Sequence, residues 1–513
     1  MKSFHTFRRN VKLVLKLGAG FFADAYDLFV IDIVLSILEQ ESLVDPSGID
    51  FSTFSKSVIA SATSIGAVVG MILFGLIGDY LGRKKGVLIT GSLVAIGSLL
   101  SAACVRSSSV PLMTQLAIYR TLLGIGIGGE YPLSATMASE GSDAKVRGRI
   151  VAGVFSMQGV GMLFSSLLGY TLIVSGASLE FTWRFLLAFG AVPAFIALYF
   201  RLQMKESPPQ TTTSMPPRYL IVTQQDAEKP NTIVSVPSST DSSPKTPRGS
   251  GEGLSRWQQS VAIIKANKLP LIATCLSWYL LDVTFYGTGE FKHAVAHELF
   301  PADPSASPSE IVANGALFGI IISCIALPGY ICACIFIDSI GRWRLQAGGF
   351  IAMTLLYVIM AIAIKFNAPS SLNLVIFGLT FFFTNFGPNT TTFIIPSEIY
   401  PHAVRATCHG LSAAWGKAGA ITGAAGFPPC SSALGLDGVM YICAAIAASG
   451  FGVTWGLLDK KLVDAAANRP QENKYLQNSD IEIAGIKRND NHDDSISEST
   501  SNSLPRPEND IQV

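Results

Sequence analysis

The sequence predicts an all-α membrane protein in which twelve transmembrane helices form two six-helix bundles. Three observations carry this prediction: the composition, the recurrence of long apolar segments, and an internal duplication. Hydrophobic residues make up 49% of the 513 residues and Asp, Glu, Lys and Arg only 14%, about half the charged share of a soluble protein. The formal net charge of +1 provides no overall basicity for nucleic-acid binding. We therefore expect the lipid bilayer as a partner and no nucleic acid.

Apolar segments of about twenty residues, each long enough to cross a hydrocarbon core of about 30 Å, recur in two groups of six. The first group covers residues 17–38, 54–78, 86–105, 110–138, 148–175 and 183–203. The second group covers residues 268–290, 311–337, 346–365, 371–396, 404–428 and 438–458. The first segment follows a basic N-terminus, but it carries three aspartates and no small-residue cleavage site. We therefore interpret it as a retained span and not as a signal peptide.

Loop charges predict the orientation of the chain. With the N-terminus inside, the short inner loops carry nine basic residues: Arg83, Lys84, Lys85, Lys145, Arg147, Arg149, Arg342, Arg344 and Arg405. The outer loops carry only Arg106, Lys292 and Lys365. Because positive charge accumulates in cytoplasmic loops, both termini are expected in the cytoplasm.

Two polar segments flank the second bundle in the sequence. Residues 204–257 contain eight prolines and many Ser and Thr residues, a composition that does not form a packed core. The predicted organisation is a bundle at 1–203, a disordered cytoplasmic loop at 204–257, a bundle at 258–460 and a disordered cytoplasmic tail at 461–513. Ser243 and Thr246 each precede a proline and match a kinase that would act on the 204–257 loop, although generic disordered composition explains them equally well.

The two groups of spans are related by an internal duplication. Like residues or strings recur at an offset of 258 or 259 positions: Asp24 and Asp282, the D-x-x-G-R strings at 79–83 and 338–342, Glu140 and Glu398, and Arg147 and Arg405. Two homologous bundles related by an axis along the membrane normal are typical of transporters that bind substrate between the bundles near the middle of the membrane.

Ionisable residues inside the expected spans are candidates for function, because a charge at bilayer depth costs several kcal/mol. They include Asp24, Asp27, Arg120, Glu130, Asp282 and Lys417. Lys417 lies 13 residues into its span, or about 20 Å deep. A buried cation with carboxylates on other helices suits coupled transport of an anion and protons. Buried ion pairs that only hold helices together are the alternative.

The sequence shows no pattern typical of an enzyme, a metal site or a disulfide framework. The eight cysteines lack the paired spacing of a zinc site or a disulfide framework, and no Ser/His/Asp set appears, so we expect no enzyme, no metal and no cofactor. Gly124, Gly126 and Gly129 spell G-x-G-x-x-G. No strand–helix unit surrounds them, so the pattern predicts close helix packing rather than dinucleotide binding.

Several strings resemble a known transporter family. Residues 75–84 (GLIGDYLGRK), with the repeat at 338–342, resemble the loop 2–3 signature of the major facilitator superfamily. Residues 128–140 (GGEYPLSATMASE) are similar to the signature of the proton-coupled inorganic phosphate symporters of fungi and plants. Residues 20–29, 278–287 and 386–401 resemble spans 1, 7 and 10 of that family. The resemblance implies the major facilitator fold, inorganic phosphate and protons as partners, and the plasma membrane as the location.

Carried over position by position, the resemblance also implies site residues. The phosphate site would consist of Tyr131, Gln158, Trp278, Asp282, Tyr286, Asn389 and Lys417. The proton route would involve Asp24, Asp27 and Glu130. Independently, Trp278, Asp282 and Tyr286 are spaced by four and share one helical face. A carboxylate such as Asp282 can accept hydrogen bonds from dihydrogen phosphate while rejecting a fully deprotonated anion such as sulfate.

These observations predict import of inorganic phosphate with protons by alternating access. Eight charged residues at the inner helix ends are expected to hold the outward-open state: Asp79, Arg83, Glu140, Arg147, Asp338, Arg342, Glu398 and Arg405. Glu130 stands where the family signature usually has Asp. This departure leaves a proton-coupled glycerophosphodiester or organophosphate permease as one alternative. A phosphate-sensing receptor that signals without transport is the other.

Overall fold

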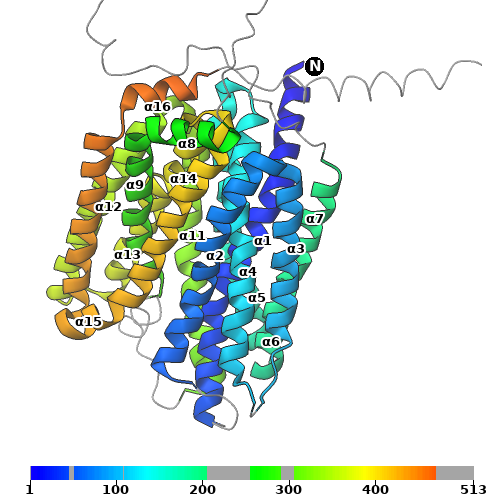
Figure 1. The fold of residues 1–513 in the computed structure, drawn as a ribbon. Coiled ribbons are helices and arrows are strands. Elements are labelled where there is room, and N and C mark those ends of the chain that lie inside the picture. The colour runs from blue at the N-terminus through cyan, green and yellow to red at the C-terminus, as the bar shows by residue number, and fades with distance from the viewer. Residues whose placement is uncertain (1, 45–50, 108, 205–254, 291–305, 470–513) are drawn as a thin grey trace, which may run out of the picture. The chain divides into compact units, whose positions relative to one another are not determined.

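The computed structural model describes residues 2–44, 51–107, 109–204, 255–290 and 306–469, and these ranges are helical without β-strands. Figure 1 shows the order of the helices. The first half contains α1 (Lys2–Val44), α2 (Thr53–Leu81), α3 (Arg83–Ala102), α4 (Leu112–Glu140), the 3₁₀ turn η1 (Ala144–Val146), α5 (Arg147–Val174), α6 (Leu179–Phe189) and α7 (Ala191–Leu202). The second half contains α8 (Arg256–Ala266), α9 (Lys268–Glu290), α11 (Pro308–Ile340), α12 (Arg342–Lys365), α13 (Ser370–Asn385), α14 (Pro388–Ile399), the 3₁₀ turn η5 (His402–Val404), α15 (Arg405–Leu457) and α16 (Lys460–Ala467).

The helices account for the twelve expected spans. Within the described ranges, nine helical segments are long and apolar enough to cross a membrane. Helices α1 and α4 carry buried charges and lie outside this set. Helix α15 holds two of the expected spans, because it continues through Gly435, where φ is 74° and ψ is 172°. A left-handed φ of this kind favours glycine, so the change of direction occurs at this residue.

Two expected spans are each divided into two helices. Gly190 separates α6 from α7, and a side chain there would collide with Asp27, whose Oδ1 would lie 2.1 Å from an added Cβ. Gly387 separates α13 from α14 with φ −165° and ψ −118°, and Pro388 opens the new helix. Proline at the first position of a helix needs no backbone donor. The second break lies directly before Asn389, one of the expected phosphate ligands.

The internal duplication is visible in the backbone. Gly82 joins α2 to α3 with φ 102°, and Gly341 joins α11 to α12 with φ 91°. The two positions are 259 residues apart, and both need a conformation that other residues rarely adopt. The 3₁₀ turns η1 and η5 also match, since each lies directly before a helix that begins with arginine, Arg147 or Arg405.

The G-x-G-x-x-G pattern on α4 serves helix packing, as predicted. A Cβ on Gly124 would lie 2.2 Å from the Thr63 carbonyl oxygen of α2, and one on Gly126 would lie 2.8 Å from the Thr90 carbonyl oxygen of α3. Neighbouring backbones therefore approach α4 too closely for larger residues.

The two halves meet through two matching helix pairs, α2 with α15 and α5 with α11. The backbones are close here too, because a Cβ on Gly410 of α15 would lie 2.2 Å from the Met71 carbonyl oxygen of α2. On the other side, Gly159 of α5 packs against the ring of Tyr330 of α11.

Two expectations about the polar segments need correction. Residues expected at the start of the disordered tail form helix α16, which extends over Lys460–Ala467. Helix α8 begins at Arg256, inside the expected 204–257 loop, and its N-terminus is capped by Ser255 and Gln258. The remainder of that loop, the two Ser/Thr-Pro sites and residues 470–513 lie outside the described residues.

Candidate functional site

Lys417 is buried between the two halves, with 2% of its surface exposed. Its Nζ lies 3.8 Å from Oδ2 of Asp282 on α9 and donates a hydrogen bond to the hydroxyl of Tyr286, one turn further along the same helix. The Nζ is also 4.0 Å from the centroid of the Tyr286 ring and 5.4 Å from that of Tyr131 on α4. The cation is therefore held by one carboxylate and two phenol rings.

Trp278 precedes Asp282 by one turn of α9 and is also buried. Its ring centroid lies 6.3 Å from that of Tyr131. The helical spacing of Trp278, Asp282 and Tyr286 thus brings all three to the same face of α9, next to Tyr131 and Lys417. The structure brings together five of the seven expected phosphate ligands.

The sixth expected ligand, Asn389, lies in the first turn of α14. Its Nδ2 donates to the hydroxyl of Tyr330 on α11 at 3.0 Å and to Oδ1 of Asn385 at 2.8 Å. Its described hydrogen bonds go to these groups and not to Lys417. Asn389 therefore belongs to a neighbouring polar group, built on the break at Gly387.

The seventh expected ligand, Gln158 on α5, is 3% exposed. Its Oε1 accepts no hydrogen bond from the described residues. Buried polar atoms normally have a partner, so this amide oxygen is free to accept a bond from a group that the protein itself does not supply.

Next to the Lys417 site lies a layer of aromatic rings from both halves, here called the aromatic layer: Phe21, Tyr131, Phe155, Trp278 and Phe393. Phe393 is central, with ring centroids 5.0 Å from Phe21, 4.6 Å from Phe155, 6.1 Å from Tyr131 and 6.4 Å from Trp278. His409 on α15 contacts the layer and is fully buried, with its Nε2 3.0 Å from the Phe393 carbonyl oxygen.

The expected gating residues lie at one end of the helices, here called the charged end, which carries Asp79, Arg83, Glu140, Arg147, Asp338, Arg342, Glu398 and Arg405. Tyr131 precedes Glu140 by nine residues of α4, so about 14 Å of helix separates the aromatic layer from this end.

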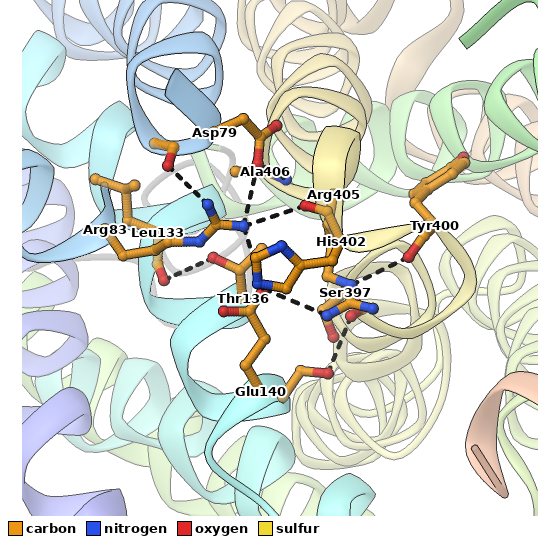
Figure 2. Close-up of polar contacts among 12 residues, drawn as sticks. Asp79, Arg83, Leu133, Thr136, Glu140, Ser397, Tyr400, His402, Arg405 and Ala406 are labelled. Carbon is orange, nitrogen blue, oxygen red and sulfur yellow. Dashed lines mark hydrogen bonds and ion pairs between the residues drawn. The ribbon is translucent and has the colours of Figure 1, made fainter. Parts of the chain in front are cut away.

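Glu140 is the centre of the contacts at the charged end (Figure 2). Its Oε1 lies 3.2 Å from Arg83 Nη2, 3.3 Å from Arg405 Nη1 and 3.2 Å from His402 Nε2. Arg83 belongs to the first half, whereas Arg405 and His402 belong to the second. One buried carboxylate therefore joins the two halves.

Asp79 adds a second connection between the halves. Its Oδ2 accepts hydrogen bonds of 2.7 Å from both the backbone N–H and the hydroxyl of Thr407, and its Oδ1 accepts one of 3.2 Å from the backbone N–H of Ala406. These amides belong to the first turn of α15, where a carboxylate is favourable next to the helix N-terminus.

The matching cluster in the second half is arranged differently. Arg342 makes two hydrogen bonds of 2.9 Å to Glu398 and a 2.8 Å ion pair with Asp338, all within that half. Across the halves, Arg149 Nε lies 3.5 Å from Asp338 Oδ2, and the Arg149 side chain is 53% exposed. Arg147 donates hydrogen bonds to the carbonyl oxygen of Ala466, within α16, and to that of Arg469, just after α16.

The residues of the expected proton route lie inside the first half. Asp27 accepts a 2.9 Å hydrogen bond from Ser98, and Arg120 donates to its backbone carbonyl oxygen. Asp24 is 2% exposed and its Oδ2 accepts no hydrogen bond from the described residues.

Glu130 occupies a buried ion pair that the sequence reading did not include. Its Oε2 lies 2.6 Å from Nη2 of Arg201 on α7, and both side chains are almost fully buried. Thr90 donates to Oε1 at 2.6 Å and Ser134 to Oε2 at 3.2 Å. Glu130 therefore faces α3 and α7, whereas the adjacent Tyr131 faces the second half.

At the end opposite to the charged end, a pocket lies between the two halves. Its lining includes Asp32 on α1, Ser64 on α2, Tyr286 on α9 and Ile421 on α15. Tyr286 also contacts Lys417, so the pocket leads to the candidate site. The structure therefore has a pocket on one side of Lys417, whereas aromatic rings and ion pairs close the other side.

Among the arginines and histidines at these sites, sequence reasoning missed three: Arg201, His402 and His409. Arg201 had a signal, since it falls inside the expected span 183–203. His402 had none, because its counterpart 258 positions earlier is Ala144. His409 also has no charged counterpart, since the equivalent position holds Val151.

Comparisons with known proteins agree with this architecture. The pattern of the "Sugar (and other) transporter" family matches residues 13–228 and 307–458. The chain is 32% identical to a probable inorganic phosphate transporter 1-6 of Arabidopsis thaliana over 87% of this chain and 90% of that protein. It is 35% identical to inorganic phosphate transporter 1-1 of Oryza sativa subsp. japonica over 80% of this chain and 82% of that protein.

Among solved structures, the proton:xylose symporter XylE of the major facilitator superfamily matches with a TM-score of 0.64 at 18% identity, over 88% of this chain and 96% of XylE. An inward open conformation of XylE from E. coli matches with a TM-score of 0.59 at 18% identity, over 92% and 99% of the two chains. The protein is a multi-pass membrane protein with the major facilitator fold. It belongs to the sugar (and other) transporter family, and its curated relatives are inorganic phosphate transporters of plants.

Proposed function

We propose that this protein imports inorganic phosphate together with protons by alternating access. The observation that carries the proposal is Lys417, a buried cation reached by side chains of α4 and α9 and paired with Asp282 at 3.8 Å. A lysine that has lost its water is a strong site for an anion, and the neighbouring Tyr and Trp residues supply hydrogen-bond donors.

The acceptors beside Lys417 favour phosphate over other anions. Asp282 and the free Oε1 of Gln158 accept hydrogen bonds, which dihydrogen phosphate can donate and sulfate cannot. A fully ionised anion would leave these buried acceptors unpaired or repel the carboxylate, and both outcomes cost free energy.

Alternating access is supported by the opposite condition of the two ends. The pocket at Tyr286 opens away from the charged end, while Glu140 and Asp79 connect the halves at that end. We interpret the described state as facing outward, with the charged end and both termini in the cytoplasm and the chain in the plasma membrane. Entry of phosphate and protons would be followed by separation of the charged-end contacts. No chemical change in phosphate is needed, so we propose no enzymatic activity.

The organophosphate alternative gains no support from Glu130. The extra methylene that distinguishes it from Asp is taken up by the contact with Arg201 and Thr90, inside the first half. It does not enlarge or reduce the space around Lys417.

The test is uptake of radiolabelled phosphate into proteoliposomes that contain the purified protein, with and without an inward proton gradient. Glycerophosphocholine and sulfate serve as competitors. We expect gradient-driven uptake that neither competitor reduces. Inhibition by glycerophosphocholine would move the protein to the organophosphate permeases, and phosphate binding without uptake would support a receptor.

A further inference from the structure

Tyr330 on α11 is a buried tyrosine that the sequence patterns did not single out, with 1% of its surface exposed. Its hydroxyl accepts a hydrogen bond of 3.0 Å from Nδ2 of Asn389. No described residue accepts a hydrogen bond from the hydroxyl in return. Buried polar groups normally make all the bonds they can, because a bond left unmade costs free energy. The O–H group of Tyr330 is therefore free to donate to a group that the protein itself does not supply.

Close packing of α11 on α13 places Tyr330 at the break between α13 and α14. The preceding residue is Gly329, where an added Cβ would lie 2.4 Å from the Phe382 carbonyl oxygen of α13. A larger residue would push the two helices apart. Asn385, at the end of α13, also donates a hydrogen bond of 3.4 Å to the Ala326 carbonyl oxygen of α11. The tyrosine ring is therefore fixed beside the first turn of α14.

Tyr330 also reaches the first half and the candidate site. On α5, a Cβ on Gly159 would lie 2.7 Å from Cδ2 of the Tyr330 ring, and Gly159 directly follows Gln158. The Tyr330 hydroxyl interacts electrostatically with the carboxylate of Asp282 and with both phenol groups beside Lys417. Tyr330 therefore adjoins both the Lys417 site and the turn of α5 that carries Gln158.

The side-chain amide of Asn389 has a defined orientation. Its Nδ2 lies 2.8 Å from Oδ1 of Asn385 and 3.0 Å from the Tyr330 hydroxyl. Asn385 uses its own Nδ2 on the Ala326 carbonyl oxygen, so its Oδ1 needs a donor, and the atom of Asn389 that faces it is the nitrogen. Both N–H bonds of the Asn389 amide are therefore used inside the protein. Its Oδ1, which accepts no hydrogen bond from the described residues, is the atom left for a substrate.

We propose that Tyr330 is a further phosphate-binding residue, whose hydroxyl donates to a phosphate oxygen, and that Asn389 binds the phosphate as an acceptor and not as a donor. The proposal rests on the phosphate transport proposed above. Dihydrogen phosphate has bare oxygens, which accept from Lys417 and Tyr330, and hydroxyl groups, which donate to Asp282 and Asn389. An anion without hydroxyl groups leaves the Asn389 carbonyl unpaired. Tyr330 therefore contributes affinity for any such anion, whereas Asn389 contributes the preference for protonated phosphate.

The test measures equilibrium binding of radiolabelled phosphate to the purified full chain in detergent, with unlabelled phosphate and sulfate as competitors. Mildly acidic buffer keeps the phosphate hydroxyl groups protonated, and binding requires neither transport nor a proton gradient. The variants are Tyr330→Phe, which removes only the hydroxyl, and Asn389→Ala, which removes the amide. The matched control is Tyr357→Phe on α12. Tyr357 is also 1% exposed, but its hydroxyl faces threonine side chains.

The expected results differ between the variants. Tyr330→Phe should weaken phosphate binding about tenfold or more, because a hydrogen bond to a charged group is lost, and should keep the preference for phosphate over sulfate. Asn389→Ala should weaken phosphate binding and reduce that preference, since the carbonyl that disfavours sulfate is gone. Tyr357→Phe should bind both anions as the wild-type protein does.

Three outcomes would contradict the proposal in different ways. Wild-type phosphate affinity in Tyr330→Phe would overturn the donor role, and this variant decides alone, because it keeps the ring and its packing. Loss of the preference over sulfate in Tyr330→Phe, as in Asn389→Ala, would show that the hydroxyl only positions Asn389. An unchanged preference in Asn389→Ala would overturn the acceptor role. If the wild-type protein binds no phosphate, the proposed function itself fails, which separates that failure from an error about Tyr330.

Discussion

Glu140 on α4 and Arg405 at the start of α15 form an ion pair of 3.3 Å that joins the two homologous halves of the chain. Both side chains are almost fully buried, at 5% and 6% exposure. The same carboxylate oxygen faces Arg83 and His402. The closed charged end therefore depends on one carboxylate oxygen that two buried arginines, Arg83 and Arg405, share as donors.

Glu140→Gln should destabilise the closed charged end. The substitution leaves two buried guanidinium groups beside a neutral amide, and breaking a buried pair costs about 3–5 kcal/mol. We expect phosphate uptake to slow and the charged end to become accessible. Accessibility can be measured by labelling of a cysteine introduced at Ser139, which in the described state donates a hydrogen bond to the Ser397 carbonyl oxygen.

Arg149→Gln is the matched control, because the Arg149–Asp338 ion pair also joins the two halves, but the Arg149 side chain is 53% exposed. Exposed pairs contribute about 0–1 kcal/mol, so uptake and labelling should stay near wild type. An equal effect of the two substitutions would show that Glu140 has no special part in closure.

Lys417→Ala should abolish phosphate uptake while the protein still reaches the membrane. The substitution removes the cation and leaves Asp282 buried without a positive partner, so an anion meets the uncompensated charge of a carboxylate. Uptake is measured together with the amount of folded protein in the membrane. Lys56→Ala, which breaks only an exposed pair with Glu39, should leave uptake unchanged. Normal phosphate affinity in Lys417→Ala would remove Lys417 from the site.

Glu130→Asp should weaken coupling without changing substrate choice. The shorter side chain cannot keep the 2.6 Å contact with Arg201 and the hydrogen bond from Thr90 at the same time. We expect a drop of about tenfold or more in gradient-driven uptake, since charge-assisted hydrogen bonds contribute roughly 1.5–3 kcal/mol. Competition by glycerophosphocholine should be the same as in wild type. A change in that competition would place Glu130 at the substrate.

Gly341→Ala should lower thermal stability, because Ala is strained at the φ of 91° that joins α11 to α12. A cost of about 1–2 kcal/mol follows from the left-handed conformation. Gly348 on α12 offers a matched control, since a Cβ there would have no atom within 4 Å and Ala favours the helix by about 1 kcal/mol. Unfolding midpoints of the purified protein in detergent give the comparison, and equal midpoints would contradict the strain.

Much of this architecture follows from sequence pattern because long apolar segments and an offset of 258 or 259 residues are local and regular properties. The same regularity predicted that the D-x-x-G-R strings and Glu140 would gather at one end. Trp278, Asp282 and Tyr286 were also predictable as a group, since a spacing of four fixes their common face.

Other contacts depend on how distant helices pack, which periodicity does not reveal. Arg201 could be recognised as a buried charge in its span, but its partner 71 residues earlier, Glu130, is fixed only by the close approach of α1 and α3 to α7 through Gly20 and Gly91. His402 has no equivalent in the first half. The sequence pattern also did not predict that Arg147 would contact α16. A short polar helix is stable only where it has a surface to pack on, and the sequence does not reveal that surface.

The unequal placement of the cross-half contacts has a consequence for the order of opening. On the α5–α11 side, the contact between Arg149 and Asp338 faces water, where salt at physiological ionic strength screens charges over about 8 Å. On the other side, Glu140 is shielded from ions by the helices around it. The α5–α11 side also has hydrogen bonds from Arg147 to the carbonyl oxygens of Ala466 and Arg469 and from the Arg149 backbone N–H to Asp338. Separation should therefore begin at the exposed Arg149–Asp338 ion pair and end at the buried contacts of Glu140 and Arg147. The turnover rate should then depend little on ionic strength, because the contacts that break last are the ones that salt does not reach.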